Sequence, residues 1–480
     1  MSPALLSRSR LQTFAWSLQD PRIACRTPAH VFAALQRPES WMWLDCASDP
    51  GGWSYLASFP EVTADVRRNR TFSSEQGAAR QTLSVGGLDA LRALLKSEPL
   101  LHRPASAPPF CGGWAGWISY DLQETAASDD SQTLAAMCRF DVLLAYCHAD
   151  QQWWVCGQAG SLTEARSKIE RLLTQIAPAE KTGQATTGMA SCRARPVIAN
   201  VHASEFERRV QRGLAYIANG HIYQVNLAQR FSADWELSEA ELYLRLRSES
   251  PAQFGAFLPS SLTGARVGVL SISPELFLRV RGREVVTRPI KGTRPSSTAG
   301  DALRAARELD GSAKERAELN MIVDLLRNDL GRVCEYGSVV VASSGETQVL
   351  PNLVHRVATV RGRLRSDAGL VDLLQAAFPG GSVTGAPKIR AMQIIRELEG
   401  EPRGPYCGAI GWFSGTDMEL SIAIRTALVD PAGKRVHYHA GSGIVADSDP
   451  RSEYEETLHK TRAFFKAINA TLPPKGPSTT

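Results

Sequence analysis

The sequence of 480 residues lacks the features that mark several specialised classes of protein. No window approaches the roughly 20 apolar residues of a membrane span, and the apolar run at the N-terminus is too short for a secretory signal. Lysine and arginine form no run with interleaved aromatics, and the net charge is only +5, which argues against a nucleic-acid track. We therefore expect a cytoplasmic protein that binds small acidic molecules.

Cysteine is also scarce and scattered. The nine cysteines form no CxxC pair and are odd in number, which indicates free thiols and not a disulfide framework or a zinc site. None of them stands in the G-x-C-x-G setting that a glutamine-hydrolysing nucleophile needs. We therefore do not expect this chain to hydrolyse glutamine.

What is present is the composition of a folded globular protein. Apolar residues make up 43% and charged residues 21%, and the length favours two or three domains or one unusually large one. Eight of the ten tryptophans precede residue 155, in stretches with strand-like alternation, so residues 1–176 are predicted to be β-rich with a helix at 162–176. The polar segment 177–197 is predicted to be a linker or long loop, and residues 198–470 alternate strands with helices.

Two pairs of glutamates have helical spacing. Glu315 and Glu318 lie three residues apart in one helical pattern, and Glu453 and Glu456 repeat the spacing in another. Pairs that face each other would suit Mg²⁺, a hard ion that takes one or two carboxylates and completes its shell with waters and an anionic substrate. The alternative is that both pairs belong to solvated helix faces.

Two glycine-rich stretches resemble nucleotide-binding loops, but their context excludes that function. Residues 440–450 have G-x-G-x-x-A spacing, yet turn residues follow where a dinucleotide fold needs a helix, and residues 380–388 lack the Gly-Lys-Ser/Thr order of a phosphate loop. We expect instead a glycine turn at Gly441 and Gly443 whose N–H groups approach a carboxylate. We also expect a helix start after Thr384 that presents N–H groups to an anion, with a plain capped helix as the alternative.

Three single basic residues in apolar strand patterns are further candidates for a functional site. Lys291 lies in RPIKGTRP, residues 288–295, where a strand expected to end at the lysine would place its amine on one face. An amine withdrawn from water can act as a nucleophile or pair with a substrate carboxylate, and the alternative is a lysine that snorkels from a strand edge. Taken alone, Arg425 favours function because a buried arginine needs an anionic partner, whereas His355 favours a core role.

Together these motifs resemble those of the chorismate-utilising enzymes. The matching stretches follow the order of that family: SPELF at 273–277, PIKGTRP at 289–295, KERAELNMIVDLLRNDLGRV at 314–333, TGAPK at 384–388, RGPYCGAIGW at 403–412, AIRTA at 423–427, and AGSGIVADSDP with EETLHK. The resemblance is strong over residues 200–468. It implies an α/β (α+β) fold in which two large, mostly antiparallel sheets pack as a sandwich with helices outside and chorismate between the sheets.

One lysine distinguishes the branches of this family. Anthranilate synthase large subunits generally carry alanine in place of Lys291, and isochorismate or salicylate synthases carry lysine in place of Gln224. The chain therefore resembles the aminodeoxychorismate synthase component I branch, which serves para-aminobenzoate and folate synthesis. The resemblance implies that Lys291 attacks C2 of chorismate, Glu275 protonates the departing C4 hydroxyl, and ammonia then adds at C4 and expels the lysine. An anthranilate synthase is the nearer alternative, and a non-catalytic sensor of chorismate or tryptophan is the more distant one.

The resemblance also implies a Mg²⁺ site and a substrate site. Glu318 and Glu456 would bind the metal directly, and Glu315 and Glu453 would reach it through water. His355 falls at a catalytic position of the family, which replaces the core role inferred above. The residues implied to hold the substrate are Gln224, Thr384, Tyr406, Arg425, Gly441, Gly443 and Lys460.

The implied partners follow from the same resemblance. Because no glutaminase cysteine is present, ammonia should come from a separate glutamine amidotransferase subunit in a heterodimer. The chain ends about a dozen residues after its last expected helix, so aminodeoxychorismate lyase is expected to be another protein. Some members of the family bind tryptophan between N-terminal strands, and residues 54–61 lie where that pocket would be, without the Leu-Leu-Glu-Ser signature of feedback-inhibited anthranilate synthases.

Overall fold

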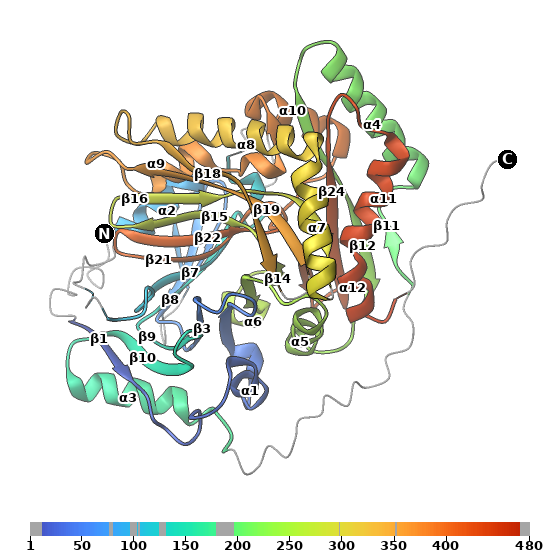
Figure 1. Ribbon diagram of the computed structural model, residues 1–480. Coiled ribbons are helices and arrows are strands. Elements are labelled where there is room, and N and C mark those ends of the chain that lie inside the picture. Colours follow the sequence, from blue (N-terminus) through green and yellow to red (C-terminus); the bar gives the residue numbers. More distant parts are fainter. Residues whose placement is uncertain are drawn as a thin grey trace.

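The computed structural model describes residues 12–75, 80–96, 103, 106–123, 131–178, 196–296, 298–350 and 353–470 (Figure 1). The predicted linker at 177–197 lies almost entirely outside the described residues. Of the helices that are described, none combines the length and the apolar composition that a membrane span requires.

Twelve strands form a first antiparallel sheet. In spatial order they are β1 (Gln12–Ser17), β10 (Gln152–Ala159), β9 (Val142–Cys147), β3 (Trp53–Ser58), β2 (Trp41–Asp45), β13 (Phe254–Leu258), β14 (Gly268–Ser273), β23 (Thr426–Asp430), β24 (Arg435–Ile444), β12 (Gln224–Asp234) and β11 (Ile198–Ala199), with β20 (Gly385–Ala386) paired to β12.

Twelve further strands form a second antiparallel sheet. In spatial order they are β17 (Ile290–Pro295), β19 (Leu353–Arg363), β16 (Glu284–Arg288), β15 (Leu276–Arg281), β22 (Asp417–Ile422), β21 (Ala409–Ser414), β7 (Gly113–Ile118), β8 (Ala135–Phe140), β4 (Val62–Val66), β5 (Thr71–Glu75) and β6 (Gln81–Leu83), with β18 (Val340–Leu350) paired to β19.

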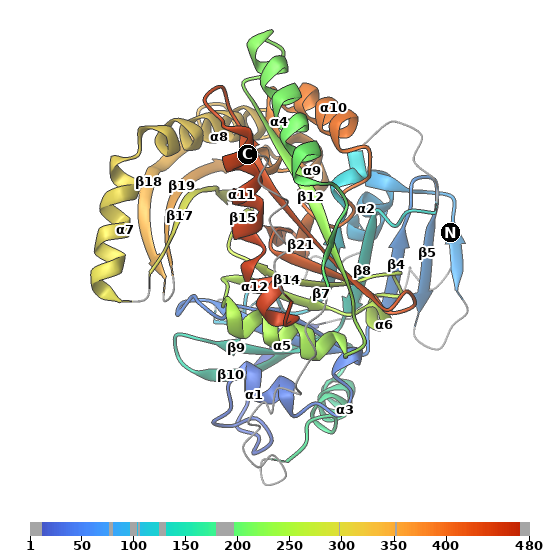
Figure 2. The same cartoon turned by 90° about the vertical axis from the view of Figure 1, so that its right-hand side faces the viewer.

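Helices cover the outside of the two sheets, as the family resemblance implied (Figures 1 and 2). In chain order they are α1 (Pro28–Ala33), α2 (Gly87–Lys96), α3 (Leu162–Leu173), α4 (Ala203–Ala218), α5 (Glu239–Glu249), α6 (Ser260–Thr263), α7 (Ala299–Gly311), α8 (Ala313–Gly331), α9 (Leu370–Ala377), α10 (Lys388–Glu399), α11 (Pro450–Lys460) and α12 (Arg462–Ala467). The predicted fold of two large antiparallel sheets with helices outside is therefore confirmed.

The β-rich N-terminal region and the C-terminal region share both sheets. In the first sheet β2 pairs with β13, so that Trp43 lies opposite Phe257. In the second sheet β7 pairs with β21, so that Ala115 lies opposite Trp412. Strands from the two halves of the chain are therefore hydrogen-bonded to each other, and the C-terminal strands that carry the site are braced by N-terminal ones.

Large apolar side chains fill the space between the two sheets. Met42 and Leu143 of the first sheet and Trp117 and Trp412 of the second belong to one buried cluster. The rings of Phe110 and Trp412 stack with centroids 5.0 Å apart. Burial of each such side chain contributes about 1.5–3 kcal/mol. This cluster fixes the two sheets against each other and holds the site between rigid walls.

Two capped helices carry the glutamate pairs. In α8, Ser312 accepts a hydrogen bond of 3.3 Å from the Glu315 backbone N–H, and Leu319, Ile322 and Leu326 form the buried stripe. In α11, Asp449 is the capping residue and Pro450 occupies the first turn. α11 packs on β24 and on α4, which Figure 2 shows beside it, and α8 packs on β17, β18 and β19. α11 thus packs on the first sheet and α8 on the second.

Candidate active site

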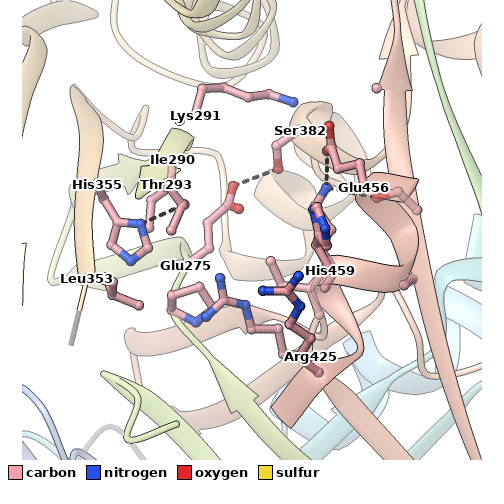
Figure 3. Close-up of a pocket in the computed structure, with 18 of the residues that line it drawn as sticks. Glu275, Ile290, Lys291, Thr293, Leu353, His355, Ser382, Arg425, Glu456 and His459 are labelled. Atoms are coloured by element: carbon pink, nitrogen blue, oxygen red, sulfur yellow. Dashed lines mark hydrogen bonds and ion pairs between the residues drawn. The ribbon is translucent and has the colours of Figure 1, made fainter. Parts of the chain in front are cut away.

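A cavity of about 1250 Å³ lies between these two helices. One wall comes from α8 and from residues 290–294 and 353–355 of the second sheet, and the other comes from residues 438–443 and 452–463. Figure 3 shows side chains from both walls pointing toward one another. All of the residues that the sequence marked for the site line this cavity except Gln224 and Thr384.

Lys291 lies in β17, where the local geometry differs from the predicted one. The strand expected to end at this lysine is broken at Pro289, and β17 continues past Lys291. β17 bulges against β19 between Lys291 and Thr293, where Gly292 adopts a φ of 74°. Because the break and the bulge disturb strict alternation, both Ile290 and Lys291 line the cavity.

The Lys291 amine extends into the cavity with no ion pair to any residue that the structure describes (Figure 3). Burial raises the pKa values of Glu275 and Glu318, and the Lys291 charge opposes the increase at both carboxyls. A Cβ placed on Gly443 would lie 3.6 Å from Lys291 Nζ, so the glycine leaves the end of the lysine room to move. The amine is therefore free and lies within electrostatic reach of two carboxyl groups.

Glu275 is buried in the connection between β14 and β15. Burial raises its pKa to about 7, and a hydrogen bond from Ser382 and the Lys291 charge offset that effect only in part. Ser382 Oγ donates to Glu275 Oε1 at 2.6 Å (Figure 3). A carboxyl that keeps its proton near neutral pH and points into a cavity is equipped to act as a general acid.

Ser382 was not among the residues that the sequence marked. It lies in a one-turn 3-10 helix, Gly381–Val383, within the loop before α10. Two hydrogen bonds hold this loop, from Thr384 Oγ1 to the Gly380 carbonyl at 3.0 Å and from Arg403 Nη1 to the Val383 carbonyl at 2.9 Å. Thr384 is fully buried and serves this loop, so its contact with substrate stays a prediction. The available signal for Ser382 was a hydroxyl residue directly after the glycine pair that precedes TGAPK.

The four glutamates of α8 and α11 face the same cavity. Burial raises the pKa of Glu318, and the charges of Glu456 and Glu453 raise it further, which places the carboxylates of the two helices within reach of each other. Three of the four also contact neighbouring groups: Glu315 with Arg294 at 2.9 Å, Glu453 with the Ser448 hydroxyl at 2.6 Å, and Glu456 with Lys460 at 2.7 Å.

The four glutamates do not form a complete set of metal ligands by themselves. Among the described residues, no set of three or more His, Cys, Asp or Glu side chains could hold a metal ion by itself. The donors are all oxygens, and Glu315 Oε2 is buried without a hydrogen-bond partner among the described residues. Such a set fits Mg²⁺, which binds through few carboxylates and leaves positions for water and substrate.

Arg425 occupies a turn and not the strand that its apolar neighbours predicted. It lies between β22 and β23 with a φ of 51°, a left-handed conformation that is uncommon for a residue with a Cβ. Burial lowers the pKa of its guanidinium, and no described carboxylate pairs with it. A desolvated arginine without a protein counter-ion is a binding group for an anion from solution.

His355 and Tyr406 complete this end of the cavity. His355 Nδ1 is 2.9 Å from the Thr293 hydroxyl, and its Nε2 is buried with no partner in the described part of the chain. Burial lowers the pKa of His355 to about 3, and the Arg425 charge acts in the same direction, so the imidazole is neutral. The Tyr406 ring stacks on His439 with centroids 4.9 Å apart.

The predicted glycine turn is wrong. Gly441 and Gly443 lie inside β24, opposite Ala228 and Asn226 of β12, and the turn begins only after the strand ends. The glycines still line the cavity, and the Gly441 carbonyl accepts a hydrogen bond of 2.8 Å from Lys460. Strand glycines allow close packing because they carry no side chain. The predicted contact of their backbone with a substrate carboxylate stays a prediction.

Gln224 is not among the residues that line the cavity. It is the first residue of β12 and only 1% exposed. A Cβ on Gly443 would lie 2.7 Å from Gln224 Nε2 and 3.6 Å from Lys291 Nζ, so the amide and the lysine amine approach the same side of this glycine. The Gln224 Oε1 atom has no hydrogen-bond partner among the described residues. Its predicted contact with substrate stays a prediction.

A second cavity of about 310 Å³ lies between β2 and β3 of the first sheet and β21 and β22 of the second. Asp45, which lines it, pairs with Arg247 at 2.6 Å. Of the stretch 54–61, where the tryptophan pocket of some family members would lie, Tyr55 lines this cavity.

Comparison with known proteins finds relatives over most of the chain. A family model described as chorismate binding enzyme matches residues 47–466. The chain is 40% identical over 444 residues to anthranilate synthase component 1 of Streptomyces coelicolor, covering 88% of this chain and 84% of that protein. It is 37% identical over 422 residues to aminodeoxychorismate synthase component 1 of Salmonella typhimurium, covering 86% and 89%.

A solved structure agrees with the fold. Anthranilate synthase component I from Streptococcus pneumoniae superposes with a TM-score of 0.72 at 28% identity, covering 93% of this chain and 99% of that one. Relatives of both names are thus similar to the chain to a comparable degree, which leaves the individual reaction open. The family model covers most of the chain, and the chain belongs to the family of chorismate binding enzymes.

Proposed function

We propose that the protein is an aminodeoxychorismate synthase component I, which replaces the C4 hydroxyl of chorismate by an amino group. The observation that supports this most is the Lys291 amine, which has no ion pair in the described chain and lies within reach of Glu275 and Glu318. The alanine that anthranilate synthases generally carry at this position would leave C2 of the substrate without a nucleophile from the protein.

In the first step, the unprotonated form of the Lys291 amine bonds through Nζ to C2 of chorismate, the ring double bonds shift, and the bond between C4 and its hydroxyl breaks. Glu275 gives its proton to the departing oxygen, which leaves as water. A general acid works best with a pKa near the operating pH, and burial places the pKa of Glu275 at about 7. The hydrogen bond from Ser382 aims the carboxyl.

In the second step, ammonia bonds to C4, the double bonds shift back, and the bond between C2 and Lys291 Nζ breaks. The proton that the new amine loses returns to Glu275, which restores the starting state of both residues. The balance is chorismate plus ammonia giving aminodeoxychorismate plus water. Two allylic displacements by nitrogen thus need only one amine and one acid from the protein.

The substrate carries two carboxylates, and the cavity offers cationic and polar groups for them. Arg425, with Tyr406 and neutral His355 nearby, would hold one carboxylate at the buried end. Lys460, which now contacts Glu456 and the Gly441 carbonyl, would hold the other. Charge-assisted hydrogen bonds of this kind are about twice as strong as neutral ones.

Mg²⁺ is part of the proposal. Glu318 and Glu456 would bind the ion directly, and Glu315 and Glu453 would bind it through water. When bound, Mg²⁺ supplies positive charge that neutralises the crowded carboxylates and holds the carboxylate on the substrate ring. The chain's own contribution is to keep four carboxylates on two fixed helices.

A glutamine amidotransferase subunit would supply the ammonia. None of the nine cysteines stands in a glutaminase nucleophile setting, so this chain does not itself release ammonia from glutamine by that route. The product would need a separate lyase to become para-aminobenzoate. Both partners follow from the proposed reaction and share its test.

The test is the product formed from chorismate, MgCl₂ and an ammonium salt, with and without added aminodeoxychorismate lyase. We expect para-aminobenzoate only when the lyase is present, and no anthranilate fluorescence in either case. Glu275→Gln is the matched control and should form neither product. Anthranilate as the sole product would favour the second candidate, an anthranilate synthase, which the 40% identical relative supports.

A further inference from the structure

One wall of the cavity carries a tyrosine that the proposed reaction does not use. Tyr438 lies in β24, lines the cavity and is only 1% exposed. Its hydroxyl is buried and has no hydrogen-bond partner among the described residues. A buried hydroxyl without a partner destabilises a fold, so its presence in a cavity wall indicates a ligand that satisfies it.

The position of this hydroxyl is fixed by packing. The Tyr438 backbone lies between Phe231 of β12 and Ala427 of β23 in the first sheet. Its ring stacks on Phe464 of α12, with centroids 4.6 Å apart and planes 12° from parallel. The ring belongs to a buried apolar cluster and is held by this stacking, so a ligand would meet a donor already in place.

Arg425 lies two residues before Ala427, the β23 partner of Tyr438, and Arg425, His355 and Tyr438 line the same cavity. Burial raises the pKa of Tyr438, and the Arg425 charge opposes the increase, while the same charge adds to the effect of burial on the His355 pKa. Arg425 has no ion pair and His355 Nε2 no hydrogen bond within the described chain. A guanidinium, a protonated phenol and a neutral imidazole are together suited to a planar carboxylate.

We propose that Tyr438 is a substrate-binding residue whose hydroxyl donates a hydrogen bond to the carboxylate that Arg425 binds. The inference rests on the proposed function in one respect, that the ligand is chorismate. It does not depend on which amino product is formed. It assigns to the cavity a donor on β24 that no sequence motif marked.

The test measures chorismate binding, by quenching of intrinsic tryptophan fluorescence, in the full chain with MgCl₂ and without ammonia. Tyr438→Phe should raise the dissociation constant about tenfold or more, because a hydrogen bond to a charged group is lost. Tyr243→Phe is the matched control: Tyr243 is buried in the same apolar cluster but lies outside the cavity. It should bind chorismate within about twofold of wild type.

A double variant shows whether the two donors share one carboxylate. In an Arg425→Gln background, Tyr438→Phe should change the dissociation constant less than about threefold, because residues that act on one group are not additive. Equal effects in both backgrounds would overturn the inference, as would wild-type affinity in Tyr438→Phe. Since that change removes only an unpaired hydroxyl, the melting temperature should not fall, and a variant that fails to fold would also contradict it.

The outcomes separate this inference from the proposed function. If the wild-type protein binds chorismate but forms anthranilate, the proposed function fails and the role of Tyr438 is still decided by the binding data. If the wild-type protein does not bind chorismate at all, both fail. A KM that rises in Tyr438→Phe with kcat nearly unchanged would agree with a binding role.

Discussion

Ser382 Oγ donates a hydrogen bond of 2.6 Å to Glu275 Oε1, across 107 residues of sequence. The bond joins the loop before α10 to the connection between β14 and β15. Two effects act on the same carboxyl, because burial raises the pKa of Glu275 to about 7 while the bond from Ser382 lowers it. Ser382 therefore both aims the candidate acid and limits how far its pKa rises.

Removal of this hydroxyl should change the pH profile. Ser382→Ala deletes the hydrogen bond to the ionised form of Glu275, so its pKa should rise by about one unit. The midpoint of the alkaline limb of the kcat profile should move to higher pH by the same amount. At pH 6, kcat should fall about tenfold because the carboxyl is no longer held in place. The measurement is the pH dependence of kcat between pH 5 and 9.

Ser382→Thr is the matched control for that change. It keeps a hydroxyl at the same position, so the alkaline limb of its kcat profile should have the same midpoint as that of the wild-type enzyme. A structural role alone would lower the activity of Ser382→Ala without moving the limb, and that result would contradict the link to Glu275.

The pH dependence of the wild-type enzyme follows from the same carboxyl. Glu275 must carry its proton to protonate the departing hydroxyl, and burial raises its pKa to about 7. Activity that depends on the acid should therefore be retained below about pH 7 and be lost as the pH rises through that value. An alkaline limb with its midpoint near pH 5 would show that Glu275 is not the acid.

The glutamates should differ in their effect on Mg²⁺ affinity, measured by calorimetry with chorismate present. Glu318→Gln and Glu456→Gln remove direct ligands and should weaken binding more than about 100-fold. Glu315→Gln and Glu453→Gln act through water and should weaken it about 10- to 100-fold. Equal small losses at all four positions would contradict the assignment.

Glu455 supplies the control for charge alone. It lines the same cavity one residue from Glu456, and its carboxylate lies 3.6 Å from Arg451. Glu455→Gln removes one negative charge without removing a predicted ligand, so Mg²⁺ affinity should change less than about threefold.

A buried ion pair behind the site should be important for stability. Lys388 Nζ lies 2.7 Å from Asp329 Oδ2 and donates to the Ala377 carbonyl at 2.6 Å, which ties α10 to α8. Burial raises the pKa of Asp329 and lowers that of Lys388, and in both cases the charge of the partner opposes the effect. Each group is therefore kept ionised by the charge of the other. Lys388→Met leaves the Asp329 charge unpaired and should reduce the free energy of unfolding by about 3–5 kcal/mol in urea titrations.

Two variants check that explanation. Asp329→Leu with Lys388→Met removes both charges and should recover most of the loss. Arg92→Ala breaks the more exposed pair with Asp372 and should cost at most about 1 kcal/mol. A double variant as unstable as Lys388→Met would show that packing, and not the unpaired charge, explains the effect.

Much of the site could be predicted because it depends on local periodicity. Glu315 and Glu318, like Glu453 and Glu456, lie three residues apart, and an α-helix puts such residues on one side whatever surrounds it. The ordered motifs then indicated one cavity between two sheets. Sequence spacing could show that each pair exists, but only the pairing of distant strands shows that the two helices face each other.

The residues that were missed or misplaced depend on contacts between distant segments. Arg425 was assigned to a strand because its neighbours are apolar, whereas its left-handed backbone is set by the passage from one sheet to the other. Gly441 and Gly443 looked like turn residues but are strand positions that approach Gln224 and Asn226 closely. Ser382 and Tyr438 carry no local signal beyond their residue type, since their partners come from elsewhere in the chain.

The most direct test of the central claim, that Lys291 is the nucleophile, is mass spectrometry of the enzyme with chorismate and MgCl₂ in the absence of ammonia. Lys314 and Lys460 line the same cavity and serve as internal controls. We expect an adduct with the mass of chorismate less one water, located on Lys291, and absent from Lys291→Ala. Full formation of aminodeoxychorismate by Lys291→Ala, or an adduct on another lysine only, would contradict the account.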